Sequence, residues 1–125
     1  MSQPQSGILP EAGPFALYAV LKVTGDAAKV VQQCKLLQST LDRLNEQQPN
    51  AELVGAVSFG QTFWQAQTQS NLEDFATFPQ YGKGEIVAPA TEGDLLIHLH
   101  SNRLDLNFLA SVSYTHLTLP TIYSV

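Results

Sequence analysis

The sequence predicts an α+β fold in which one antiparallel sheet carries helices on one face. Short, mostly apolar runs recur three times along the 125 residues, as is typical of strands buried on at least one face. Two other stretches repeat apolar residues every three or four positions, the spacing of an amphipathic helix. Apolar residues make up 44% of the chain and charged residues 14%, so we expect one ordered domain rather than intrinsic disorder.

The first half of the chain gives an arm, a strand and a helix. Residues 1–13 are rich in Pro, Gln, Ser and Gly and have no apolar period, so we expect an extended arm. A strand is predicted over 15–23, where an almost continuous apolar run is closed by Gly25. Asp26 then offers an N-cap for one long helix that ends at Pro49. Its buried stripe is predicted to be Val30, Val31, Cys34, Leu37, Leu41 and Leu44.

The second half gives two strands, a loop and a helix. A strand is predicted over 53–60, where small residues would let the preceding helix approach the sheet. Residues 61–93 have no sustained period, so we expect an ordered loop with a short helix around 63–66. Residues 94–101 form the clearest strand pattern, and a second amphipathic helix begins at 102–109. The loop also contains Pro79 and Pro89 and is expected to be held by its aromatic residues, Phe75, Phe78 and Tyr81.

This order, β-α-β-loop-β-α, is most of a ferredoxin-like β-α-β-β-α-β unit. We therefore expect a truncated ferredoxin-like domain over 14–110 with its final strand missing, which leaves one sheet edge unpaired. The segment 111–125 has no Asp, Glu, Lys or Arg and interrupts the helical pattern. Residues Val112 to Thr121 resemble one translated frame of a transposase adapter used to prepare DNA libraries, so we expect 111–125 to be a non-native tail. The alternative is a native Thr-rich strand that completes the sheet.

Charge and cysteine content exclude several classes of protein. The net charge is -5 and the six Lys and Arg residues are scattered, so we expect neither nucleic-acid binding nor an anionic membrane surface. No apolar run is long enough to span a bilayer. One cysteine cannot form an internal disulfide, and the N-terminus carries no secretory signal pattern. We expect a soluble protein of the reducing cytoplasm.

Three histidines and one cysteine could suggest metal binding or nucleophilic chemistry. His98 and His100 share one face of a strand, but no third ligand is near them in sequence, so we expect packed or solvated side chains. His116 lies in the predicted tail and is not a candidate. Cys34 belongs to the apolar stripe, where a buried inert thiol is expected rather than a nucleophile. No catalytic, cofactor-binding or metal-ligating residue is therefore assigned.

The remaining candidates also favour structural roles. The segment from Tyr81 to Gly84 lacks the spacing of a P-loop, so a structured turn is expected. Trp64 could relay an electron, but packing under the loop is the preferred interpretation. Three acidic residues are interpreted as helix-start residues rather than paired catalytic carboxylates, namely Asp26, Glu73 and Asp74.

Four segments of the chain resemble the N-terminal part of the dye-decolorising (Dyp-type) haem peroxidases, in particular their cytoplasmic branch. They are residues 2–10, residues 57–60 with Trp64 just after them, residues 78–84, and residues 94–101. The family's subunit is similar to two ferredoxin-like domains in tandem, which agrees with the predicted element order. The resemblance extends over nearly all of the chain before the tail.

The resemblance implies oxidation of a reducing substrate by hydrogen peroxide at a b-type haem iron. In the family a distal Asp in a Gly-x-x-Asp-Gly motif, a distal Arg and a proximal His carry this chemistry. Gly93 and Asp94 are not that motif, because Leu95 follows them. We expect the distal Asp, distal Arg and proximal His to be absent from this fragment, which would be inactive and free of haem, and the parent to be a homo-oligomer. The alternative is a stand-alone ferredoxin-like module that binds a partner or oligomerises without catalysis.

Overall fold

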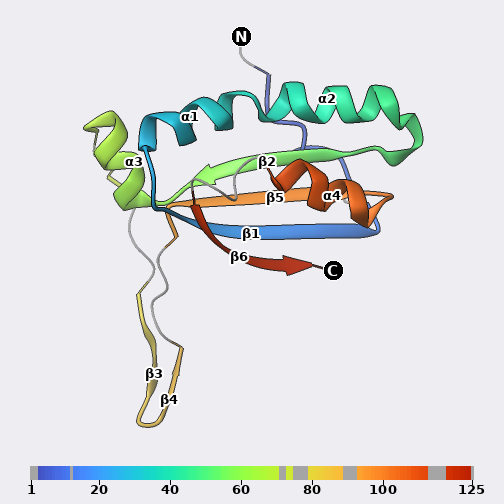
Figure 1. Ribbon diagram of the computed structural model, residues 1–125. Helices are drawn as coiled ribbons and strands as arrows, with labels where there is room; N and C mark the ends of the chain where they lie inside the picture. The colour runs from blue at the N-terminus through green and yellow to red at the C-terminus, as the bar shows by residue number, and fades with distance from the viewer. Residues whose placement is uncertain are drawn as a thin grey trace.

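The computed structural model describes residues 3–11, 13–70, 73–74, 79–88, 93–112 and 118–124. Four strands form one sheet in the order β2-β5-β1-β6 (Figure 1). All three neighbouring pairs are antiparallel. This strand order and pairing are those of a ferredoxin-like unit, which confirms the predicted fold class. The strands are β1 (Phe15–Val23), β2 (Val54–Phe59), β5 (Leu95–Ser101) and β6 (Thr118–Ser124).

The described helices and a separate hairpin complete the domain. The helices are α1 (Ala27–Lys35), α2 (Leu37–Gln47), α3 (Gln61–Thr68) and α4 (Leu104–Ser111), with a short 3-10 turn, η1, at Pro49–Ala51. Strands β3 (Tyr81–Lys83) and β4 (Ile86–Ala88) form a two-stranded hairpin that extends away from the rest of the domain in Figure 1. Helices α1, α2 and α4 contribute buried side chains to the same core, namely Val30, Leu37, Leu41, Leu44, Leu106 and Ala110.

The core forms where inward-facing residues of neighbouring strands meet in register. Leu99 of β5 lies opposite Leu17 of β1 on one side and Gly55 of β2 on the other. A Cβ atom at Gly55 would lie 2.5 Å from Cδ2 of Leu99 and 3.2 Å from Cδ1 of Leu41. The missing side chain therefore lets α2 lie close to the sheet, as the small residues of this strand predicted.

A buried polar contact closes one end of the core. The Ser101 hydroxyl donates to Oδ1 of Asn107 (2.8 Å), and Nδ2 of Asn107 donates to the carbonyl oxygen of Phe15 (3.3 Å). Ser101 and Asn107 are both fully buried. These hydrogen bonds tie α4 to β5 and β1 and satisfy groups that would otherwise be buried without partners.

The prediction of a single helix between the first two strands is wrong, because the chain breaks at Leu36 into α1 and α2. The Leu36 N–H donates to the carbonyl oxygen of Gln33, a tighter turn than an α-helix makes. The hydroxyl groups of Ser39 and Thr40 both donate to the Leu36 carbonyl oxygen. Such back-bonding bends helices and exposes Leu36, although the apolar stripe stays in phase.

The prediction that the final strand is missing is also wrong for this chain. Residues 118–124 pair with β1 from Leu17 to Val23 as strand β6. Without this partner, the outer edge of β1 would present unpaired N–H and C=O groups. A segment rich in Thr and aliphatic residues has the backbone preference to occupy such an edge.

The predicted loop over 61–93 contains more regular structure than expected. Helix α3 confirms the short helix, but the β3-β4 hairpin was not predicted, because its two strands have three residues each. Glu73 and Asp74 lie in an exposed turn. Phe75, Phe78 and Pro89, like His116, lie outside the described residues.

The N-terminal arm covers the outer edge of β2. The side-chain amide of Gln5 donates to the Val57 carbonyl oxygen (3.0 Å) and accepts from the Val57 N–H (2.8 Å). The Gly7 N–H donates to the Gly55 carbonyl oxygen (2.8 Å), and the Ser6 hydroxyl accepts from the Gly55 N–H (3.1 Å). The arm thus makes the hydrogen bonds that a fifth strand would make and blunts an exposed sheet edge.

Candidate functional site

The sheet face opposite the helices carries a cluster of three rings. Tyr18 of β1 lies opposite His98 of β5 in register, and His98 and His100 are two residues apart on the same strand. The ring centroids are 6.2 Å apart for Tyr18 and His98, 6.0 Å for Tyr18 and His100, and 5.4 Å for the two histidines. We call Tyr18, His98 and His100 the ring cluster. The structure places both histidines on the open face of the sheet.

Within the ring cluster, burial makes His100 less basic than a free imidazole. Nε2 of His98 lies 3.3 Å from the carbonyl oxygen of Gly7 in the arm. Nδ1 of His100 is buried and has no hydrogen-bond partner among the described residues. Burial lowers the pKa of His100 below its ordinary value, and the nearby His98 lowers it further. Within the described ranges, no group of three or more His, Cys, Asp or Glu residues could hold a metal ion.

His100 should make the stability of the domain sensitive to acid. Because folding lowers the pKa of His100 below 6.5, its stabilising effect is present above that pH and is lost as the pH falls through the folded pKa. Between pH 7.5 and pH 5, the free energy of unfolding is expected to fall less for His100→Gln than for the parent chain. The difference is the cost of protonating His100 in the folded domain. Urea unfolding at the two pH values measures the difference. Equal losses for both chains would contradict the prediction.

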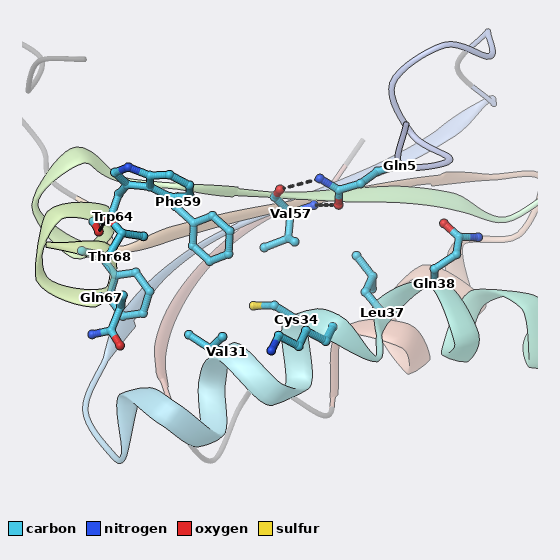
Figure 2. A pocket seen from close by; sticks show the side chains of 12 residues that line it. Gln5, Val31, Cys34, Leu37, Gln38, Val57, Phe59, Trp64, Gln67 and Thr68 are labelled. Carbon is cyan, nitrogen blue, oxygen red and sulfur yellow. Dashed lines mark hydrogen bonds between the residues drawn. The ribbon is translucent and has the colours of Figure 1, made fainter. Parts of the chain in front are cut away.

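A pocket of about 420 Å³ lies between α1, β2 and α3, beside the arm. Figure 2 shows Cys34 and Val31 of α1 on one side and Val57 and Phe59 of β2 on the other. Apart from Cys34, its apolar lining is Val31, Leu37, Val57, Phe59, Phe63 and Trp64. Its polar lining is Gln5, Lys35, Gln38, Gln67 and Thr68. The size and the mainly apolar walls are those of a small-molecule site.

Trp64 packs against Phe59, with the ring centroids 6.1 Å apart, and Phe59 stacks on Phe63 at 5.9 Å. The indole N–H of Trp64 is buried and has no acceptor among the described residues. In Figure 2 this nitrogen lies on the side of the ring away from Cys34. The ring thus forms a wall of the pocket, and its packing matches the preferred interpretation of Trp64.

The Cys34 thiol is half-buried in the same pocket. Burial raises the pKa of Cys34 to about 11, because a thiolate there would lose its hydration. The thiol is therefore protonated at neutral pH and is a poor nucleophile and a poor metal ligand.

Alkylation should report the protonated state of Cys34 directly. At pH 8 we expect iodoacetamide to modify Cys34 about a hundredfold more slowly than a model thiol, because its pKa is raised from 9.0 to about 11. The rate should climb steeply between pH 9 and pH 11. Mass spectrometry of timed samples measures it, and the urea-unfolded chain serves as the fast control. A native rate equal to the unfolded rate at pH 8 would contradict the prediction.

The acidic and glycine-rich candidates have structural roles. Oδ2 of Asp94 accepts from the Val23 N–H (2.7 Å), and the Asp94 N–H donates to the Leu21 carbonyl oxygen (2.9 Å), so Asp94 fastens the end of β1. Asp26 caps α1 by accepting from the Ala28 N–H (2.9 Å). Lys83 lies in the exposed hairpin, whose Gly84 has φ +64° at the turn. The hairpin offers no helix N-terminus to hold a phosphate.

Among the described residues, the side chains that could ligate haem iron are divided between the pocket and the open sheet face. Haem iron needs an axial imidazole, thiolate or phenolate that faces a cavity. The lining of the described pocket contains no His or Tyr, and its one thiol, Cys34, is protonated. The imidazoles of His98 and His100 lie on the sheet face instead, against Tyr18 and the arm.

Comparison with known proteins gives one consistent family. Residues 5–118 match the family model for the N-terminal domain of Dyp-type peroxidases. A dye-decolorizing protein from V. cholerae shares 38% sequence identity, with a TM-score of 0.84 over 95% of this chain and 43% of its own. A DypB variant from Rhodococcus jostii, solved in complex with heme, shares 20% identity, with a TM-score of 0.83 over 95% of this chain and 41% of its own. An encapsulated DyP-type peroxidase from Mycobacterium smegmatis shares 23% identity, with a TM-score of 0.77 over 98% of this chain and 41% of its own.

The chain spans less than half the length of these solved relatives. The two relatives below 25% identity support the fold alone. Among the helices that the structure describes, none has the length and apolarity needed to cross a bilayer.

Proposed function

Because the chain belongs to the Dyp-type peroxidase family through its N-terminal domain, we propose that it is the first part of a haem peroxidase that uses hydrogen peroxide to oxidise a reducing substrate. The observation that carries this proposal is the family match over residues 5–118. The matching fold supports it, with 38% identity to a dye-decolorizing protein.

In this proposal the chain contributes a framework and not the catalytic groups. The proximal His, distal Arg and distal Asp belong to the remainder of the parent protein, so the 125-residue chain alone is inactive and carries no haem. The open face with its ring cluster, Tyr18, His98 and His100, is the surface offered to that remainder. The parent is a cytoplasmic homo-oligomer, and its reducing substrate is chosen by residues outside this chain.

Residues 111–125 are proposed to be a non-native tail that occupies the position of the native fourth strand. The resemblance of Val112 to Thr121 to a translated adapter supports this origin, and pairing with β1 requires only a segment of suitable strand preference. Resequencing the gene across the codon for Ala110, from a library made without that transposase, tests it. A frame that continues into a Gly-x-x-Asp-Gly motif supports the proposal, and a confirmed stop after Val125 contradicts it.

Expression of both chains tests the function itself. The longer reading frame and the 125-residue chain are each purified with added haem and assayed with hydrogen peroxide and a chromogenic reductant. We expect a Soret band and turnover from the longer chain and neither from the shorter one. Stoichiometric haem uptake and turnover by the 125-residue chain would overturn the assignment of the catalytic groups.

A stand-alone binding module is the second candidate, and the complete four-stranded sheet favours it. Such a module would fold without further sequence and would dimerise or bind a partner through its open face. Light scattering and thermal unfolding of the 125-residue chain distinguish the candidates. A cooperative, stable oligomer supports the module, and a monomer that binds its own missing remainder supports the peroxidase fragment.

A further inference from the structure

We propose that the pocket between α1, β2 and α3 binds a small amphipathic carboxylate with an aliphatic body, independently of haem and peroxide. The pocket has a volume of about 420 Å³, which suits a small ligand. Its walls are apolar, so they favour a hydrocarbon body over a polar one. It lies outside the ring cluster and is lined by α1, the first turn of α2, β2, α3 and Gln5 of the arm.

The charge of the pocket favours an anionic head group. Among the described residues, Lys35 is the only charged residue of the lining. It stands in the last turn of α1, and its ammonium group makes no ion pair or hydrogen bond with any residue that the structure describes. Its ammonium group is therefore available to a carboxylate at the pocket rim, where salt would weaken the contact.

Most other polar groups of the lining already have partners within the protein. The Gln5 amide is bound to the Val57 backbone. The Gln38 amide donates to Asp42 (2.9 Å) and accepts from the Ser6 N–H (3.3 Å). The Thr68 hydroxyl donates to the Trp64 carbonyl oxygen (2.8 Å). Lys35 and Gln67 are thus left to bind the head group. The Asp42 carboxylate beside Gln38 would repel an anionic head group placed near Gln38, so the head group is expected near Lys35.

The pocket also contains its own reporters, because the chain has one tryptophan and one cysteine and Trp64 and Cys34 both line it. A ligand should change the fluorescence of Trp64 and protect Cys34 from alkylation. Neither readout depends on haem or on peroxidase activity.

The test is a titration of the 125-residue chain with decanoate, decanol and decyltrimethylammonium below their micelle concentrations, followed by Trp64 fluorescence. We expect saturable binding of decanoate and weaker binding of decyltrimethylammonium. The affinity should fall about tenfold when decanoate is shortened to octanoate. Lys35→Gln should lower the affinity for decanoate about threefold to fivefold and leave the affinity for decanol unchanged. Lys29→Gln, an exposed charge on the same helix that does not line the pocket, is the matched control and should change neither affinity.

A blocking variant separates a defined site from general apolar adsorption. Val31→Phe fills the pocket and should abolish binding of all three probes while the chain still unfolds cooperatively. If that variant does not fold, protection of Cys34 from alkylation by decanoate in the parent chain decides instead. Equal affinity for the three head groups, no effect of Lys35→Gln, or no protection of Cys34 would each overturn the proposal.

Discussion

Replacing Leu99 with alanine is expected to lower the free energy of unfolding by about 3 kcal/mol. Leu99 is fully buried and lies between Leu17 and Gly55 in the sheet register. Its Cδ2 atom occupies the space that a Cβ atom at Gly55 would need. Glycine has no side chain that could refill the space, so the cavity left by the substitution should persist and the loss should be large. Urea unfolding followed by circular dichroism measures it.

Leu96→Ala is the matched control, because Leu96 lies on the same strand with its side chain on the open, partly exposed face. We expect it to cost about 1 kcal/mol, since less apolar surface returns to water. If Leu99→Ala costs no more than Leu96→Ala, the position of the core on the helix side of the sheet is incorrect.

Gly60→Ala is expected to destabilise the domain by about 2 kcal/mol through a backbone collision. A Cβ atom at Gly60 would lie 2.1 Å from the carbonyl oxygen of Gly93. The Gly60 N–H also donates to the Asp94 carbonyl oxygen (2.8 Å), so the two backbone segments cannot separate without losing a hydrogen bond. The φ and ψ angles of Gly60, -70° and 154°, suit any residue, so the cost is steric and not conformational.

The same substitution should move α3, because Gly60 is its N-cap. Trp64 lies on α3, so its fluorescence should change together with the stability measured by urea unfolding. Thr62→Ala, an exposed change on the same helix, is the control and should stay within about 0.5 kcal/mol of the parent chain. An unchanged unfolding midpoint for Gly60→Ala would show that the two segments do not approach as closely as described.

The central sheet was predictable because its strands bury one face. Short, mostly apolar runs predicted β1 and β5. In the structure these runs bury alternate residues, and the inward set from Leu95 to Leu99 follows the period of two of a half-buried strand. The cap at Asp26 was predictable from its residue type and position. These features depend on neighbours along the chain, which a sequence displays directly.

The features that were missed leave no clear mark in the apolar pattern of the sequence. The break at Leu36 leaves the apolar stripe in phase, so periodicity cannot detect it. The β3-β4 hairpin is too short for a pattern and has exposed residues throughout. Strand β6 was predicted to be absent because residues Val112 to Thr121 resemble a translated adapter, yet an open sheet edge accepts many sequences.

The candidate site was also predictable only in part. The rule that residues i and i+2 share a strand face places His98 beside His100. Tyr18 joins them only through the register of β1 with β5, which the sequence does not specify. The pocket combines residues of the arm and of α1, α2, β2 and α3, so Cys34 and Trp64 could be interpreted singly but not as two walls of one cavity.

The arm has a consequence for how the chain is assembled during synthesis. Gln5 leaves the ribosome before Val57, its hydrogen-bonding partner, which lies 52 positions later. The entropy cost of closing such a loop grows only slowly with its length, but it must be met before the contact forms. The arm therefore cannot reach its place until β2 has been made. Until the arm is in place, the outer edge of β2 remains open to a strand from another nascent chain, and crowded translation is the stage at which this domain should be most prone to mispairing.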